Sequence, residues 1–176
     1  MDRSVEQLVD EVLVLDCQSG SAKAMEILVS RWQKRLWQYA YHLTGNSDAS
    51  WDITQESWLS IIKGLRKLQD PAKFKSWAYR ITTNKSIDWI RRRKAVKRIS
   101  IDEIEQQQLE EKKESGIKEL LEKLDITKKV ILSLYYFEQL NILEISVVLK
   151  IPQGTVKSRL HNARKELKEL YQKHFG

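Results

Sequence analysis

Apolar residues recur along most of this 176-residue chain at spacings of three and four, and only two prolines and six glycines interrupt them. That period places apolar side chains on one face of an α-helix. We find no alternating pattern of the kind that predicts a half-buried strand. The sequence therefore predicts an all-α protein, long enough for one ordinary domain or two small ones.

Tryptophan and charge are unevenly spread, and their distribution divides the chain. All six tryptophans lie in residues 1–94, and that block and residues 117–176 are each net basic. Between them, "SIDEIEQQQLEEKKESG" (100–116) is rich in Glu and Gln and has no aromatic residue. A strip of this composition does not form a core. We expect two small helical domains, 1–94 and 117–176, joined by a flexible linker at 95–116.

Composition also excludes several classes of site. The single Cys17 cannot form an internal disulfide, and three scattered histidines offer no zinc cluster. No apolar run is long enough to span a membrane, and acidic residues interrupt the N-terminal apolar stretch, unlike in a signal peptide. We expect a cytoplasmic protein without a metal or other cofactor. The net charge of +7 and the pI near 9.4 favour a polyanionic partner.

The C-terminal block contains four predicted helices, at residues 117–124, 127–138, 142–149 and 153–172. An apolar stripe in the last helix follows spacings of four and three and consists of Val156, Leu160, Ala163, Leu167 and Leu170. The opposite face is polar and consists of Lys165 with Ser158, His161 and Lys168 close by. One face of this helix is predicted to pack, which leaves the other free to bind.

The last two helices match the plan of a helix-turn-helix. Asn141 is a plausible N-cap for the shorter helix, which turns within "KIP" into the longer one. Pro152 suits a first helical turn, and Gly154 and Thr155 keep that turn slim enough to approach phosphate. Basic side chains along the helix can then contact DNA. A solvated amphipathic helix that closes a small bundle is the alternative interpretation.

The stretch "EQLNILEISVVLKIPQGTVKSRLHNARKEL" (138–167) resembles region four of the bacterial sigma factors, particularly the small extracytoplasmic-function (ECF) group. The resemblance implies that the long helix recognises the minus-35 promoter element. The residues implied in this DNA contact are Gln153, Gly154, Thr155, Lys157, Ser158, Arg159, His161, Asn162, Arg164 and Lys165. Gln139 and Lys150 stand where the family usually has glycine. A left-handed conformation at Lys150 would cost on the order of 1 kcal/mol.

Residues 51–65 are predicted to form an amphipathic helix. Its apolar arc consists of Trp51, Trp58, Ile61, Ile62 and Leu65. Its polar arc consists of Asp52, Gln55, Glu56 and Lys63, with Leu59 among them. An apolar side chain within a polar rim is typical of a protein-binding hot spot, although a single exposed leucine is also common.

The string "DITQESWLSI" (52–61) resembles the polymerase-binding helix of sigma region two. The resemblance implies contact with the clamp helices of the largest RNA polymerase subunit. The residues implied are Asp52, Gln55, Glu56 and Leu59. Trp51 stands where an acidic residue is common, and it either extends this contact or packs inward.

The next stretch, residues 64–94, is predicted to be a loop followed by a basic helix. Gly64 and the Asp70-Pro71 pair bracket the loop, and Asp70 can cap the helix that Pro71 begins. The core face of that helix is predicted to be Phe74, Trp77, Ala78 and Ile81. Asn84 and Asp88 continue the same face, and the helix ends in "RRRK". Interleaved aromatic and cationic residues suit single-stranded DNA, because stacking on a base contributes about 1–3 kcal/mol.

"FKSWAYRITTNKSIDWIRRR" (74–93) resembles sigma regions 2.3 and 2.4. The resemblance implies promoter melting and recognition of the minus-10 element, with a flipped base held in the loop "KLQDPAKF". The residues implied are Asp70, Lys73, Phe74, Trp77, Tyr79, Arg80, Asn84, Asp88, Arg91 and Arg92. Which of the aromatic residues contact bases and which belong to the core stays open at this stage.

The two resemblances occur in the family's order, so the chain resembles an ECF sigma factor over most of its length. This implies a non-enzymatic subunit, since phosphoryl transfer belongs to the polymerase core. The implied partners are core RNA polymerase through its clamp helices and flap, promoter DNA that is duplex at minus-35 and single-stranded at minus-10, and an anti-sigma factor, with no small-molecule substrate. A stand-alone DNA-binding regulator is the main alternative. An enzyme acting on nucleic acid is disfavoured, because the sequence lacks the acid, base and metal-binding residues that such an enzyme needs.

Overall fold

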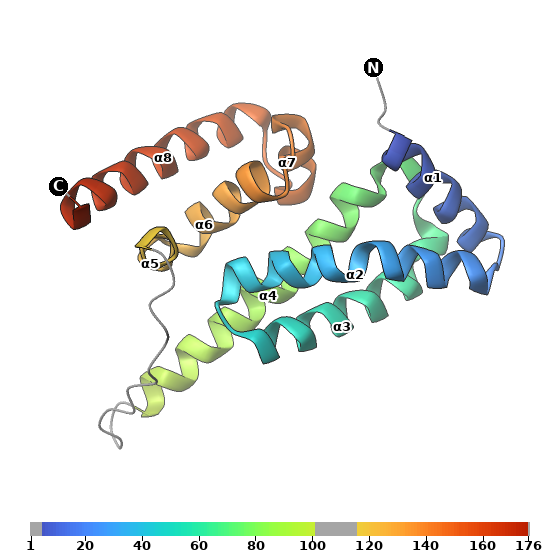
Figure 1. Ribbon diagram of the computed structural model, residues 1–176, viewed down its shortest axis with the longest axis horizontal. Coiled ribbons are helices and arrows are strands. Elements are labelled where there is room, and N and C mark those ends of the chain that lie inside the picture. Colours follow the sequence, from blue (N-terminus) through green and yellow to red (C-terminus); the bar gives the residue numbers. More distant parts are fainter. Residues whose placement is uncertain (1–4, 101–115, 176) are drawn as a thin grey trace. The chain divides into compact units, whose positions relative to one another are not determined.

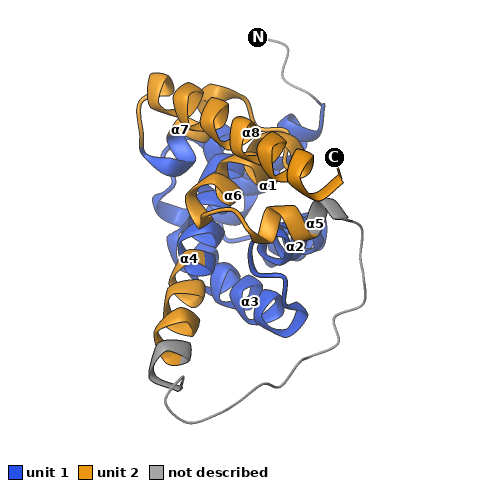
Figure 2. Ribbon diagram, turned by 90° about the vertical axis from the view of Figure 1, so that its left-hand side faces the viewer, with its two compact units in different colours: residues 1–86, 147–150 blue, residues 87–146, 151–176 orange. Residues whose placement is uncertain are grey.

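The computed structural model describes residues 5–100 and 116–175, and within them every regular element is a helix (Figure 1). Two compact units are coloured in Figure 2, residues 1–86 with 147–150 and residues 87–146 with 151–176. The all-α prediction is confirmed for the described residues. Most of the predicted linker, residues 101–115, lies outside them.

Four long helices make up the N-terminal part: α1 (Val5–Gln18), α2 (Ala22–Thr44), α3 (Ser47–Gly64) and α4 (Phe74–Ser100). Two short 3-10 turns, η1 (Leu65–Lys67) and η2 (Pro71–Lys73), occupy the predicted loop between α3 and α4. Helix α4 continues through Ser100, beyond the predicted end at Lys94. The basic run at residues 91–94 is therefore helical throughout.

Local capping explains where α2 and α3 meet. Gly45 ends α2 with a left-handed φ of 65°, and its N–H donates to the carbonyl of Tyr41. Asn46 then caps α3, its side chain accepting a hydrogen bond from the N–H of Ala49 at 2.8 Å. These two residues turn the chain sharply, so α2 and α3 form a helical hairpin.

Aromatic side chains from α2 and α4 fill the core of this part. The Trp32 ring contacts Phe74 edge-on, with centroids 5.3 Å apart, and Tyr79 at 5.8 Å. Tyr39 also contacts Tyr79 edge-on, and its hydroxyl lies 2.7 Å from that of Thr83. Edge-to-face pairs of this kind add to the stabilisation from burial alone.

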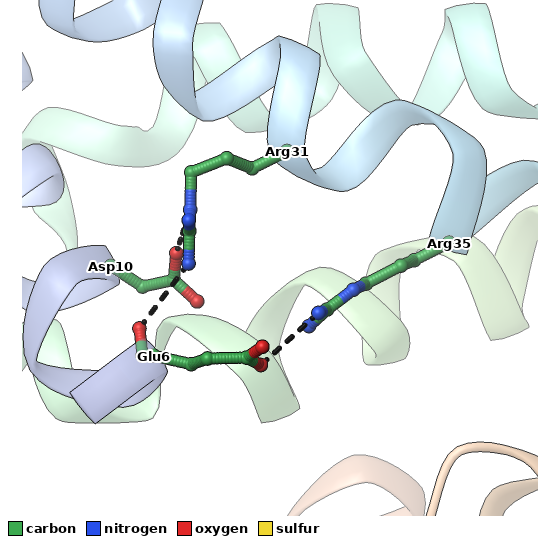
Figure 3. Close-up of polar contacts among 4 residues, drawn as sticks. All are labelled: Glu6, Asp10, Arg31 and Arg35. Carbon is green, nitrogen blue, oxygen red and sulfur yellow. Dashed lines mark hydrogen bonds and ion pairs between the residues drawn. The ribbon is translucent and has the colours of Figure 1, made fainter. Parts of the chain in front are cut away.

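Two ion pairs hold α1 against α2 (Figure 3). Arg31 donates from Nε to Oδ1 of Asp10 at 2.9 Å, and Arg35 donates to Oε2 of Glu6 at 3.1 Å. The Arg35 hydrogen bond and positive charge lower the pKa of the Glu6 carboxyl. Asp10 is buried, so its pairing with Arg31 compensates the loss of its hydration.

The C-terminal part contains α5 (Gly116–Glu122), α6 (Ile126–Leu132), a π-helical turn η3 (Ser133–Phe137), α7 (Ile142–Leu149) and α8 (Gln153–Phe175). The four helices predicted here are confirmed, except that η3 replaces the end of the second one. Helices α5 and α6 pack against α8. An ion pair between Lys128 and Glu166 also joins α6 to α8.

Candidate nucleic-acid and protein interfaces

The candidate DNA-contacting residues of α8 lie on its free face. Three residues of the predicted apolar stripe, Val156, Leu160 and Ala163, are buried, and the remaining two, Leu167 and Leu170, are half-buried. Thr155 is half-buried, and the other candidates are all exposed: Gln153, Gly154, Lys157, Ser158, Arg159, His161, Asn162, Arg164 and Lys165. The exposed face is mostly cationic or amide-bearing, so it offers hydrogen-bond donors to phosphates and base edges.

Strained backbone and a capping box set the helices of the helix-turn-helix. Lys150 adopts the left-handed conformation considered from the sequence, with φ of 54°, and Gln139 does the same with φ of 52°. Asn141 caps α7 as predicted: its Oδ1 accepts from the N–H of Glu144 at 2.9 Å, and Glu144 accepts in return from the N–H of Asn141 at 2.8 Å. The capping box satisfies two backbone N–H groups at the start of α7, whereas Gln139 and Lys150 occupy positions where glycine would be less strained.

Arg164 has aromatic partners that the sequence analysis missed. Its Nε donates a hydrogen bond to the Tyr136 hydroxyl at 2.7 Å. The guanidinium also lies over the rings of Tyr135 and Tyr136, 5.0 and 5.5 Å from their centroids. The tyrosines belong to the π-helical turn η3, and neither the family motif nor the helical period on α8 indicates this contact.

The candidate polymerase-binding residues share one exposed face of α3. Asp52, Gln55, Glu56 and Leu59 are all exposed, and the Leu59 side chain is 58% accessible. Glu56 accepts a hydrogen bond from Lys85 of α4 at 3.4 Å. An accessible leucine within a rim of carboxylates and amide is a surface that a protein partner can desolvate.

The apolar arc predicted over residues 51–65 is buried at Trp58, Ile61 and Leu65, but the prediction is wrong at Ile62. For Trp51 the sequence left packing inward and exposure both open, and the side chain is exposed. Ile62 is 48% exposed, next to Leu59, and Trp51 is 41% exposed, with its ring 5.6 Å from that of Trp37. The buried face instead includes Thr54 and Ser57, whose hydroxyls donate to the carbonyls one turn earlier. These hydroxyl residues share the core side with Ile53, Trp58 and Ile61, so Trp51 and Ile62, at the edge of the predicted arc, stay exposed.

The loop before α4 is held at both ends. Asp70 caps η2 as predicted, accepting from the N–H of Ala72 at 3.1 Å, and its carboxylate lies 3.5 Å from Nζ of the exposed Lys73. Gln18, at the end of α1, donates to the carbonyls of Leu65 and Leu68 at 3.0 and 2.8 Å. No sequence signal pointed to Gln18, which holds the predicted base-binding loop against α1.

Two of the aromatic candidates for minus-10 contact belong to the core. Phe74 and Tyr79 are 1% and 2% exposed and contact Trp32 of α2, so they pack α4 against α2 and do not face solvent. Trp77 is half-buried, and so is Arg80. The sequence left open which aromatic residues contact bases and which belong to the core. Of Phe74, Trp77 and Tyr79, only Trp77 keeps part of its surface accessible.

The polar candidates further along α4 are accessible. Asn84, Asp88, Arg91 and Arg92 are all exposed. Near them the Arg93 guanidinium lies 5.2 Å from the centroid of the Trp89 ring. An aromatic ring beside exposed cations is a suitable surface for stacked bases and backbone phosphates.

In the described ranges 5–100 and 116–175, the His, Cys, Asp and Glu side chains form no group of three or more that could hold a metal ion. The helices in these ranges are all too short or too polar to cross a membrane.

Comparison with known proteins assigns both halves to one class. The sigma-70 region 2 family matches residues 28–96, and the sigma-70 region 4 family matches residues 116–167. A helical region-two module followed by a helix-turn-helix of region four defines a sigma-70 type transcription initiation factor.

Individual relatives narrow this class. The chain is 30% identical to the RNA polymerase sigma factor SigV of Bacillus subtilis, over 73% of this chain and 80% of SigV. It is 29% identical to the ECF RNA polymerase sigma factor SigE of Mycolicibacterium smegmatis, over 84% of this chain but only 61% of SigE. The solved structure of CnrH, in complex with the cytosolic domain of CnrY, has the same fold, with a TM-score of 0.74, 24% identity, and coverage of 93% of this chain and 97% of CnrH. The chain belongs to the extracytoplasmic-function sigma factors of the sigma-70 family.

Proposed function

We propose that this sigma factor recognises promoters in two parts. Helix α8 contacts the duplex minus-35 element, and α4 with the loop before it captures melted bases of the minus-10 element. The exposed polar face of α8 is the main support, because nearly all of its candidate residues are accessible while the apolar stripe is packed. Contacts to phosphate supply affinity, and contacts to base edges supply specificity.

The exposed face of α3 is the proposed docking surface for the clamp helices of the largest polymerase subunit. Leu59 and Ile62 supply its apolar centre, and Asp52, Gln55 and Glu56 supply its polar rim. The C-terminal domain is the proposed partner of the polymerase flap. The catalytic groups for phosphoryl transfer then belong to the polymerase core, and this chain contributes recognition without a cofactor.

The proposed domains are residues 1–94 and 117–176, joined by a linker at 95–116. Once one domain binds its promoter element, the linker raises the effective concentration of the other domain at the second element. An anti-sigma factor is a further proposed partner. The solved CnrH chain, which has the same fold, is in complex with the cytosolic domain of CnrY.

Run-off transcription with purified core polymerase tests the proposal. Templates from a promoter panel carry an intact, a minus-35-scrambled or a minus-10-scrambled sequence. We expect transcripts that require this chain and both elements. Tight duplex binding by the chain alone, without any promoter-dependent transcript, would instead identify a stand-alone DNA-binding regulator.

A further inference from the structure

The contact between Tyr136 and Arg164 fixes one edge of an arginine on the candidate DNA-binding helix. The hydrogen bond of 2.7 Å uses Nε of Arg164, and both neighbouring tyrosine rings lie within 5.5 Å of the guanidinium carbon. The Tyr135 and Tyr136 rings contact each other edge-on, with centroids 5.0 Å apart. Three groups therefore restrict the rotamers of a side chain that would otherwise move freely in solvent.

This arrangement leaves hydrogen-bond donors unused. The Tyr136 hydroxyl accepts from Nε, so its own proton is free to donate to another acceptor. The two terminal nitrogens of Arg164 keep their N–H groups, which can bind two oxygens of one phosphate. Tyr136 is 53% exposed, and Arg164 is also exposed, so solvent or a ligand can reach these donors.

The positive charge of Arg164 is not neutralised within the described part of the chain, because the guanidinium there contacts the two tyrosines and no carboxylate. Lys128, by contrast, is paired with Glu166 of the same helix α8. A cation that is ordered by neutral aromatic groups retains its full attraction for an anion.

Arg164 is also aligned with other candidate DNA contacts. At 100° per residue, Gln153, Lys157 and Arg164 fall within about 40° of one another around α8. At 1.5 Å per residue, Lys157 and Arg164 are separated by about 10 Å along the helix axis. A row of this length can contact more than one phosphate of the same strand.

We propose that Tyr136 and Arg164 together form a clamp for a phosphodiester group of duplex DNA, with Tyr136 acting both as the positioning residue of Arg164 and as a second donor. The clamp deepens the proposed minus-35 recognition and rests on it. It contributes affinity independent of base sequence, because both side chains contact phosphate.

The test measures binding of holoenzyme, assembled from core polymerase and the full chain, to a labelled promoter duplex across a range of KCl concentrations. Tyr136→Phe keeps the ring and removes the hydroxyl, and Arg164→Ala removes the cation. Tyr171→Phe is the matched control, since Tyr171 is equally exposed, at 51%, and lies on α8 outside the clamp. Wild-type run-off transcription in the same preparation tests the proposed function separately.

We expect Arg164→Ala to reduce the slope of log affinity against log salt by about 0.9, as for one lost phosphate contact. Tyr136→Phe should weaken binding several-fold, equally for the promoter and for a minus-35-scrambled duplex. It should have much less effect in the Arg164→Ala background. Tyr171→Phe should match wild type.

Two outcomes would overturn the clamp while leaving the proposed function intact. In one, Tyr136→Phe lowers only the melting temperature and Arg164→Ala leaves the salt slope unchanged, which identifies a structural link. In the other, the variants weaken association with core polymerase and not with DNA, which identifies a protein-docking contact. Failure of the wild-type chain to support transcription would instead remove the proposed function.

Discussion

A Cβ atom on Gly64 would lie 2.8 Å from Cζ2 of Trp77, too close for the two to coexist without a shift. Gly64 is the last residue of α3, and Trp77 lies in the first turn of α4. The indole therefore packs over the end of α3 only because no side chain is there. Gly64→Ala should lower stability by about 1–3 kcal/mol through overpacking. Thermal unfolding followed by circular dichroism measures this change, and an unchanged midpoint would show that Trp77 moves aside freely.

The exposed face of α3 leads to a prediction on polymerase binding. Leu59→Ala should weaken association with core polymerase by at least about 1 kcal/mol, roughly fivefold or more, because Leu59 is the apolar centre of a polar rim. Its exposure of 58% means that folding should be nearly unaffected. Fluorescence anisotropy of the labelled chain titrated with core polymerase measures the effect.

Leu15→Ala is the matched control for that prediction, since Leu15 is 52% exposed on α1, away from the candidate docking face. It should bind core polymerase like wild type. Equal loss of binding in both variants would argue against a specific role of the α3 face.

Local signals predicted much of this structure. The caps at Asp70 and Asn141 were identified because capping depends on residues a few positions apart. The apolar stripe of α8 was identified because Val156, Leu160 and Ala163 are separated by four and three residues, each close to one helical turn. The family's usual glycine likewise drew attention to Lys150, whose φ is positive.

Features that depend on tertiary packing were not predicted. On α3 and α4 the core side is partly hydroxyl: Thr54 and Thr83 are buried because each donates to a carbonyl four residues earlier. A count of apolar residues alone therefore misplaced Ile62. The Tyr136–Arg164 contact joins residues 28 positions apart, and the π-helical turn that presents Tyr136 has no sequence signature here.

The ion pair between Glu6 and Arg35 predicts a pH dependence of stability. The folded-state pKa of Glu6 is lowered, so the pair stabilises the fold above the ordinary value of 4.5 and its contribution is lost as the pH falls through the folded pKa. Glu6→Gln should be less stable than wild type at pH 7, by a small amount because both side chains are accessible. Urea midpoints measured at successive pH values should converge in acid.

Glu6 is the better residue to change in that pair, since the Arg35 guanidinium also lies 5.4 Å from the centroid of the Trp32 ring. A difference between wild type and Glu6→Gln that persists unchanged in strong acid would show that the charge of Glu6 is not its cause. Added salt should reduce the difference at pH 7.

A substitution at Gly154 can distinguish an effect on the stability of α8 from an effect on DNA binding. A Cβ there would meet nothing within 4 Å, so Gly154→Ala should fold and keep or slightly raise the melting temperature. The added methyl group would stand between the first turn of α8 and the DNA, and transcription that depends on the minus-35 element should fall. If Gly154→Ala were as active as wild type on a minus-35-dependent promoter, the backbone at this position would not approach the DNA closely.

Lys157 and Arg159 test base recognition on the exposed face of α8. Both side chains are exposed, so Lys157→Ala and Arg159→Ala should leave folding intact. If either contacts a base edge, the loss should be about 1–3 kcal/mol of discrimination between the intact and the scrambled minus-35 element. A residue that contacts only phosphate should instead weaken transcription from both templates by the same factor. Run-off transcription on the two templates separates these roles. If a variant matches wild type both in its transcription rate and in its ratio between the intact and the scrambled template, the changed residue does not belong to the interface.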